Sequence, residues 1–92
     1  MQGERSNQGL EPIEAAIELL LTQMIDQQAA KVLRIARSLD SRITPEDARN
    51  PHDFLPLVES PEFQYEDGIL AGLESARIAL RAELRRLRDA KR

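Results

Sequence analysis

Apolar residues recur every three or four positions over the first long stretch of the chain, which is the spacing of one face of an α-helix. Neither proline nor glycine interrupts residues 13–43, and Pro12 stands where the first turn of a helix accepts proline. The pattern predicts one helix from about residue 11 to about residue 41. The apolar row consists of Ile13, Ile17, Leu20, Met24, Val32, Ile35 and Leu39, with Gln28 in its one polar slot.

A second row with the same spacing lies near the end of the chain and predicts a helix from about residue 65 to about residue 90. Its members are Ile69, Leu73, Ala76, Leu80, Leu84 and Leu87. Two helices of similar length joined by a compact connector favour an all-α fold, an antiparallel helical hairpin. Residues 1–10 contain two glycines and few apolar side chains. We therefore expect a flexible N-terminal leader at 1–10, followed by a single helical-hairpin domain at 11–92.

The segment between the two rows, about residues 42–64, contains four of the five prolines of the chain. Three of them follow a residue that commonly caps a helix N-terminus, in the pairs Thr44-Pro45, Asn50-Pro51 and Ser60-Pro61. Each proline also discourages helix in the residue before it. The pattern predicts a connector made of single helical turns, each started by a cap and stopped by the next proline.

The connector and the residues just after it hold the three aromatic side chains of the chain, Phe54, Phe63 and Tyr65, together with Leu57. We interpret these residues as a structural cap over the closed end of the hairpin. The alternative is a platform that binds a partner protein.

The order of charges along each helix supports an antiparallel arrangement. Residues 10–30 carry four acids and no base, while residues 31–42 carry four bases and one acid. Residues 59–74 carry five acids and no base, and residues 77–92 carry seven bases and two acids. An antiparallel pair brings unlike charges together at both ends, although each exposed ion pair contributes only about 0 to 1 kcal/mol.

Apolar residues outside the two rows suggest that one neighbouring helix cannot cover each helix. Leu19 and Leu33 lie to one side of the first row, and Ile78 lies away from the second. A symmetric dimer forming a four-helix bundle would bury both sides, with its two-fold axis near Gln27 and Gln28. The residues expected in the dimer or core seam are Ile13, Ile17, Leu20, Met24, Gln28, Val32, Ile35, Leu39, Leu73, Leu80, Leu84 and Leu87.

Two polar or small features interrupt the apolar rows. Gln28 either fixes the register between helices or lies at the edge of the row and reaches water. Gly68, Gly72 and Ala76 form a strip of small residues at helical spacing, although each glycine costs a helix up to about 1 kcal/mol relative to alanine. Close approach of a neighbouring helix or of the connector would compensate this cost.

Candidate catalytic and metal-binding residues are few. The chain has no cysteine and one histidine, so it lacks a thiol nucleophile, and one subunit cannot assemble a multi-histidine metal site. His52-Asp53 is the one place where an imidazole adjoins a carboxylate, and a capped turn explains Asp53 without chemistry. We expect no catalytic residue, no metal and no cofactor, and therefore no enzyme.

The most prominent charged pattern is a stripe of arginines near the end of the chain. A row of this kind could contact a phosphate backbone. The net charge of −3 and the absence of an aromatic residue in the row argue against nucleic acid, as do the acids that the first helix supplies. The stripe consists of Arg77, Arg81, Arg85, Arg88 and Arg92.

The sequence as a whole indicates a non-catalytic protein–protein interaction module that forms a homodimer and serves as an adaptor or as a subunit of a larger assembly. Its protein partner is not named by any motif. The alternative is a nucleic-acid-associated accessory protein that uses the arginine stripe. No apolar run is long enough to cross a membrane, so we expect no membrane partner and a cytoplasmic location.

Overall fold

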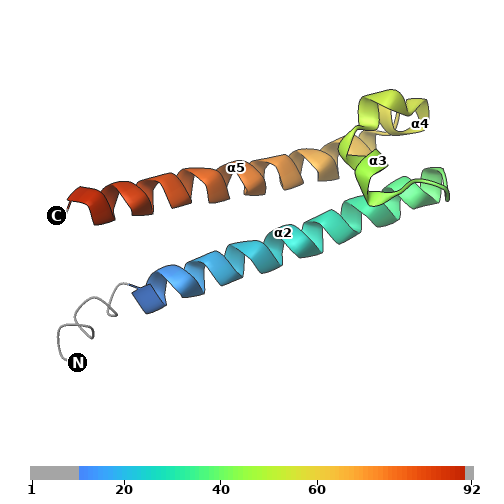
Figure 1. Ribbon diagram of the computed structural model, residues 1–92. Helices are drawn as coiled ribbons and strands as arrows, with labels where there is room; N and C mark the ends of the chain where they lie inside the picture. The colour runs from blue at the N-terminus through green and yellow to red at the C-terminus, as the bar shows by residue number, and fades with distance from the viewer. Residues whose placement is uncertain (1–10, 91–92) are drawn as a thin grey trace.

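The computed structural model describes residues 11–90, which are helical apart from short connections (Figure 1). This result confirms the prediction of an all-α chain with two long helices joined by short turns. The predicted leader at residues 1–10 lies outside the described residues. In chain order the elements are α2 (Glu11–Leu39), α3 (Pro45–Arg49), the 3-10 turn η1 (Pro51–Asp53), α4 (Leu55–Val58) and α5 (Pro61–Ala90).

The long helices α2 and α5 lie side by side, with the connector at one end (Figure 1). Near the start of α2, Glu14 accepts a hydrogen bond from Arg88 at the end of α5. Toward the other end, Lys31 forms an ion pair of 3.0 Å with Glu66. The two ends of this helix pair are called below the free end, near Glu14 and Arg88, and the connector end. Unlike charges thus meet at both ends, as the order of charges in the sequence predicts.

Each long helix contributes one row of buried or half-buried residues to the contact, and the two rows together are called the seam. The seam is mostly apolar toward the connector end, whereas its free half contains Glu14, Glu18 and Arg77. The row of α2 consists of Glu14, Glu18, Leu21, Ile25, Gln28, Val32, Ile35 and Ala36. The row of α5 consists of Phe63, Glu66, Leu70, Leu73, Arg77, Leu80 and Leu84.

The structure divides the residues that the sequence assigned to one seam. Of the predicted positions, Gln28, Val32, Ile35, Leu73, Leu80 and Leu84 lie in the seam, whereas Ile13, Ile17, Leu20, Met24, Leu39 and Leu87 are exposed. The physical reason is that α2 carries a second row at helical spacing, one position further along, which the sequence analysis did not select. That row is the one facing α5, because its glutamates pair with arginines of α5 while the apolar row beside it turns outward.

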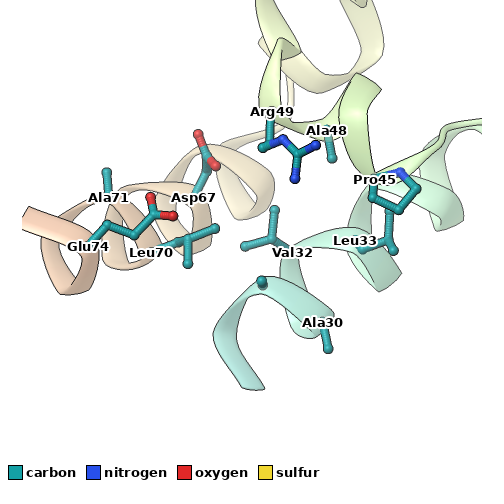
Figure 2. A pocket seen from close by; sticks show the side chains of 11 residues that line it. Ala30, Val32, Leu33, Pro45, Ala48, Arg49, Asp67, Leu70, Ala71 and Glu74 are labelled. Carbon is teal, nitrogen blue, oxygen red and sulfur yellow. The ribbon is translucent and has the colours of Figure 1, made fainter. Parts of the chain in front are cut away.

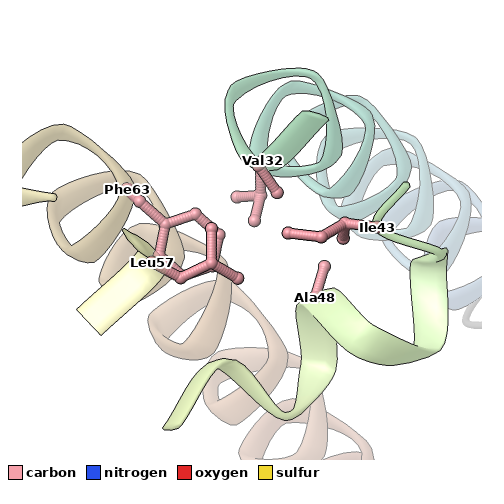
Figure 3. Close-up of a cluster of buried hydrophobic side chains, with 6 residues drawn as sticks. Val32, Ile43, Ala48, Leu57 and Phe63 are labelled. Carbon is pink, nitrogen blue, oxygen red and sulfur yellow. The ribbon is translucent and has the colours of Figure 1, made fainter. Parts of the chain in front are cut away.

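The core lies at the connector end, where the short helices fold over the helix pair (Figure 3). Leu57 of α4 and Phe63 of α5 have no exposed surface, and they pack with Val32 of α2. Ile43 and Ala48 close the cluster from the connector (Figure 3). These contacts hold the two long helices at this end.

Two of the three predicted caps are present. Thr44 and Asp47 form a capping box at the start of α3, in which each side chain accepts a hydrogen bond from the backbone of the other. Ser60 accepts a hydrogen bond of 3.1 Å from the backbone of Phe63. The predicted cap at Asn50 is wrong, because its side chain instead donates to the carbonyl of Glu46 and so helps to end α3.

The second long helix begins at Pro61, four residues before the expected start near Tyr65. Ser60 caps the helix and Pro61 occupies its first turn, where the missing backbone donor costs nothing. No further proline follows, so this turn continues into α5 instead of remaining a single turn.

Over residues 11–90, no helix has both the length and the apolar character that crossing a membrane requires.

Candidate interaction surfaces

One side of the helix pair carries the apolar residues that the seam leaves out, and we call it the apolar face. Leu20 is 56% exposed, and Met24 and Ile69 are also exposed although they border the seam. A shallow groove of about 420 Å³ runs between the helices on this side. Its lining residues are Met24, Gln27, Gln28, Lys31, Arg34, Ile69 and Leu73. The apolar face consists of Ile13, Ile17, Leu20 and Met24 on α2 with Ile69 and Leu87 on α5.

The opposite side carries a row of α5 residues whose charge changes along the helix, and we call this side the charged face. It is acidic toward the connector end, apolar at its middle and basic toward the free end. Ile78, at the middle, is 68% exposed, and Leu19 of α2 is 59% exposed. In chain order the α5 row is Asp67, Ala71, Glu74, Ile78, Arg81, Arg85 and Arg88, at steps of four and three residues.

A groove of about 490 Å³ opens on the charged face at the connector end (Figure 2). Its floor is apolar, with Val32 from α2 and Leu70 from α5. Asp67 and Glu74 stand along the α5 wall, and Arg49 of α3 lies at the end that the connector closes (Figure 2). The groove therefore combines an apolar floor with two carboxylates on one wall.

The charged form of Asp67 is disfavoured in this groove. Burial raises the pKa of Asp67, and the nearby charge of Glu74 raises it further. Within the described residues neither Asp67 nor Glu74 forms an ion pair. A cation placed in the groove would favour the charged form of Asp67.

At the free end of the charged face, two arginines are held by glutamates of α2. Both carboxylate oxygens of Glu18 accept hydrogen bonds of 2.9 Å from Arg81, and this contact lowers the pKa of Glu18. Glu14, which is buried, accepts from Arg88. Arg85, beside them, has no ion pair over residues 12–90. The basic charge at this end thus exceeds the acidic charge.

The structure does not leave the predicted arginine stripe as one free row. Arg77 lies in the seam, where its buried Nε has no hydrogen-bond partner among the described residues. Arg81 and Arg88 are bound to glutamates. Arg92 lies outside the described residues. A row tied to acids in this way is less suited to phosphate contacts than a free one, although binding to nucleic acid is untested.

Gln28 lies half-buried in the seam, where its side-chain amide donates hydrogen bonds of 2.8 Å to both the backbone carbonyl and a carboxylate oxygen of Glu66. Of the two interpretations, this contact favours the register role, since sliding α2 along α5 would break both bonds. The hydrogen bond from Gln28 and then that from Lys31 lower the pKa of Glu66.

The four residues of the predicted platform are placed differently by the structure. Leu57 and Phe63 are fully buried and Phe54 packs against the same core, which favours the structural-cap interpretation for these three. Tyr65 is 68% exposed and lies away from the core.

The strip of small residues has no close neighbour within the chain. A Cβ built on Gly68 or Gly72 would meet no other atom within 4 Å. Within one chain, neither α2 nor the connector approaches these glycines, so the part of the expectation that concerns the connector is wrong. The small-residue spacing alone could not show it, because the spacing does not reveal which side of the helix faces its neighbour.

Over the described residues, the structure brings no three histidine, cysteine or carboxylate side chains together at metal-binding distance. His52 and Asp53 form a contact of 3.5 Å in which both side chains are exposed. This pair is too open to hold a reacting group in place.

No protein-family model matches the chain, and the searches of curated proteins and of solved structures found no match either. Arguments about function consequently rest on the two faces themselves.

The sequence analysis missed the charged face as a surface. The signal was present, because residues 67–88 of α5 contain a second row at steps of four and three, next to the apolar one. The row was overlooked because its arginines were read as one basic stripe, apart from the acids that precede them at the same spacing.

Proposed function

We propose that this chain is a non-catalytic protein–protein interaction module, a helical hairpin that pairs with a second copy into a four-helix bundle and serves as an adaptor or assembly subunit. The observation that carries the proposal is the apolar face. Four aliphatic or methionine side chains in the first half of α2 are exposed along one side, next to Ile69 of α5. Exposed apolar residues in a contiguous row, unlike scattered ones, are typical of protein interaction sites.

Physical size supports the same proposal. A domain of this size has a marginal core, and over residues 12–90 the fully buried side chains lie at the connector end. The free half of the helix pair has only half-buried leucines, Leu80 and Leu84, on the α5 side of the seam, together with two ion pairs whose arginines are about half exposed. Ion pairs that reach the solvent contribute little in water. Association with another surface would supply the missing burial.

The two faces lie on opposite sides of one seam, so occupying one leaves the other open. A homodimer formed through one face therefore retains two copies of the other face for a different protein. This arrangement is what an adaptor requires, since it must hold one partner without covering the surface for the next.

Sedimentation equilibrium at micromolar concentration tests the homodimer. We expect twice the chain mass of 10.4 kDa, with a thermal unfolding midpoint that rises with protein concentration. A folded species at the monomer mass at every concentration would contradict the homodimer.

The partner surface is tested separately by changing the apolar face. Met24→Glu should abolish capture of partner proteins from an extract of the native host, whereas Gln23→Glu, one residue away on the same helix, should leave capture unchanged. Both variants add one acid to an exposed position of α2. Equal capture by the two variants would show that the apolar face is not the partner surface.

A further inference from the structure

The charged face specifies the helix that would fit it. A helix that binds there needs basic side chains opposite Asp67 and Glu74 and an apolar residue opposite Ile78. It also needs acidic side chains opposite the arginines at the free end. It must also place side chains with aliphatic stems on the apolar floor of the groove, which arginine and lysine do while keeping their charged heads at the rim.

The α5 helix of this same chain, read in the opposite direction, has that order. Asp67 and Glu74 lie about as far before Ile78 as Arg88 and Arg81 lie after it. The row keeps steps of four and three throughout, which are 4, 3 and 4 before Ile78 and 3, 4 and 3 after it, so it stays on one face of the helix. The charged face is thus complementary to a copy of itself.

We infer that the charged face binds a second copy of this chain, with the two α5 helices antiparallel and related by a two-fold axis at Ile78. Ile78 then contacts Ile78 of the second copy. Asp67 lies opposite Arg88 of the second copy, and Glu74 lies opposite its Arg81. The two-fold axis produces each of these pairs twice, as a symmetric dimer interface must.

Charge selects this orientation over the reverse one. With the two α5 helices parallel, Asp67 would lie opposite Asp67 and Arg85 opposite Arg85, and like charges would meet along the whole row. Arg81 and Arg88 can serve a second carboxylate while they bind Glu18 and Glu14, because each guanidinium has five donors and their side chains remain about half exposed.

The groove at the connector end gives this contact its apolar part. The basic end of α5 from the second copy would lie over Val32 and Leu70 and bring a cation to Asp67, whose charged form is now disfavoured by burial and by the charge of Glu74. Arg49, at the closed end, would face the last carbonyl groups of the incoming helix, which carry partial negative charge. Ile78 and Leu19 would lose their exposure at the middle of the contact.

This inference rests on the proposed function, since it names the surface that the second copy occupies. It assigns the second copy to the charged face and leaves the apolar face for a different protein.

Charge reversal tests the assignment with a built-in rescue. One variant carries Asp67→Lys and Glu74→Lys, and the other carries Arg81→Glu and Arg88→Glu. Each alone should sediment at 10.4 kDa, because its charged face repels its own copy. An equimolar mixture should sediment at twice that mass, since both rows of contacts become attractive again. Circular dichroism checks that each variant keeps its helices, and Arg34→Glu on the apolar face is the control that should dimerise like the wild type.

Single cysteines provide a second measurement, because the chain has none of its own. Ile78→Cys should form an intermolecular disulfide under mild oxidation, since a two-fold axis brings the two positions within the roughly 7 Å that a disulfide spans between Cα atoms. Leu20→Cys, which is also exposed but lies on the apolar face, should not.

The possible outcomes separate the inference from the proposed function. If the wild type dimerises, the charge variants also dimerise and Leu20→Cys is the position that crosslinks, the second copy occupies the apolar face. The inference is then wrong and the homodimer stands. If the wild type is monomeric at every concentration, both the inference and the homodimer fail.

Discussion

At the scale of single residues, the structure separates side chains that hold the fold from those that face outward. Leu57 and Phe63 have no exposed surface, while Tyr65, two residues after Phe63, is 68% exposed. The difference follows from helix geometry, because residues two apart on an α-helix point to different sides. Aromatic character in the sequence did not distinguish them.

Phe63 provides a direct test of the core. Phe63→Ala should lower the free energy of unfolding by about 3 to 5 kcal/mol, because a fully buried ring is replaced by a cavity between α2, α4 and α5. Tyr65→Ala is the matched control and should change it by less than about 0.5 kcal/mol, as an exposed substitution does. Urea unfolding measures both. Similar effects of the two changes would mean that the closed end is not packed as the structure shows.

The ion pair between Glu18 and Arg81 makes stability depend on pH in a defined direction. Hydrogen bonds from Arg81 hold the pKa of Glu18 below its usual value near 4.5, so the unfolded chain binds a proton more readily than the folded one. The contribution of Glu18 is therefore fully present at neutral pH and is lost as the pH falls through 4.5 and below.

Comparison of variants isolates this contribution. Between pH 7 and pH 3, Glu18→Gln should lose less stability than the wild type, while Glu46→Gln should lose about as much. Glu46 is a suitable control because its exposed side chain forms no ion pair with a described residue. An unchanged pH profile for Glu18→Gln would show that Arg81 does not hold this carboxylate in solution.

At the scale of elements, the sequence predicted where the helices lie along the chain better than which side of each helix contacts the other. The long uninterrupted rows, the prolines and the caps at Thr44 and Ser60 placed two long helices and a connector of short turns close to where they lie. Spacing alone could not tell which of two adjacent rows on α2 faces α5. Ile13 and Leu20 belong to the more apolar row, and yet the row with Glu14 and Glu18 is the one in contact.

The two candidate faces could likewise not be predicted from residue spacing alone. The residues of the apolar face all belong to the two apolar rows of the sequence, and all but Ile69 were expected in a dimer or core seam. A row of apolar residues does not reveal whether a helix of the same chain, a second chain or solvent lies opposite. The charged face depends on acids and arginines that are far apart along α5 but share one side of it. Recognising that face required knowing where the seam runs.

The glycines of α5 make a prediction about this helix. Gly68→Ala and Gly72→Ala together should raise the free energy of unfolding by about 1 to 2 kcal/mol, because alanine favours helix and each added methyl group would meet open space. Ala79→Gly, at another exposed position of α5, is the reverse control and should lower it by about 1 kcal/mol. Weaker self-association of the double alanine variant would show that a second chain approaches these glycines.

At the scale of the whole molecule, the contacts that hold α2 and α5 together are distributed unevenly along the helices. The connector end is held by the buried cluster of Val32, Leu57 and Phe63. At the free end the helices are joined by the ion pairs Glu14–Arg88 and Glu18–Arg81. The faces proposed for binding extend over the weakly fastened half, so occupancy by a second copy or a partner should stabilise that half most.

The concentration of the core at one end has a consequence for how the chain opens. Amide protons around Val32 and Phe63 should exchange with deuterium only through global unfolding, while those near Glu14 and Arg88 should exchange through fraying that leaves the connector end intact. In the monomer, protection should therefore fall steadily from the connector end toward the free end of both helices. In folding, contacts between α2 and α5 would form first at the connector end and then extend toward the free end.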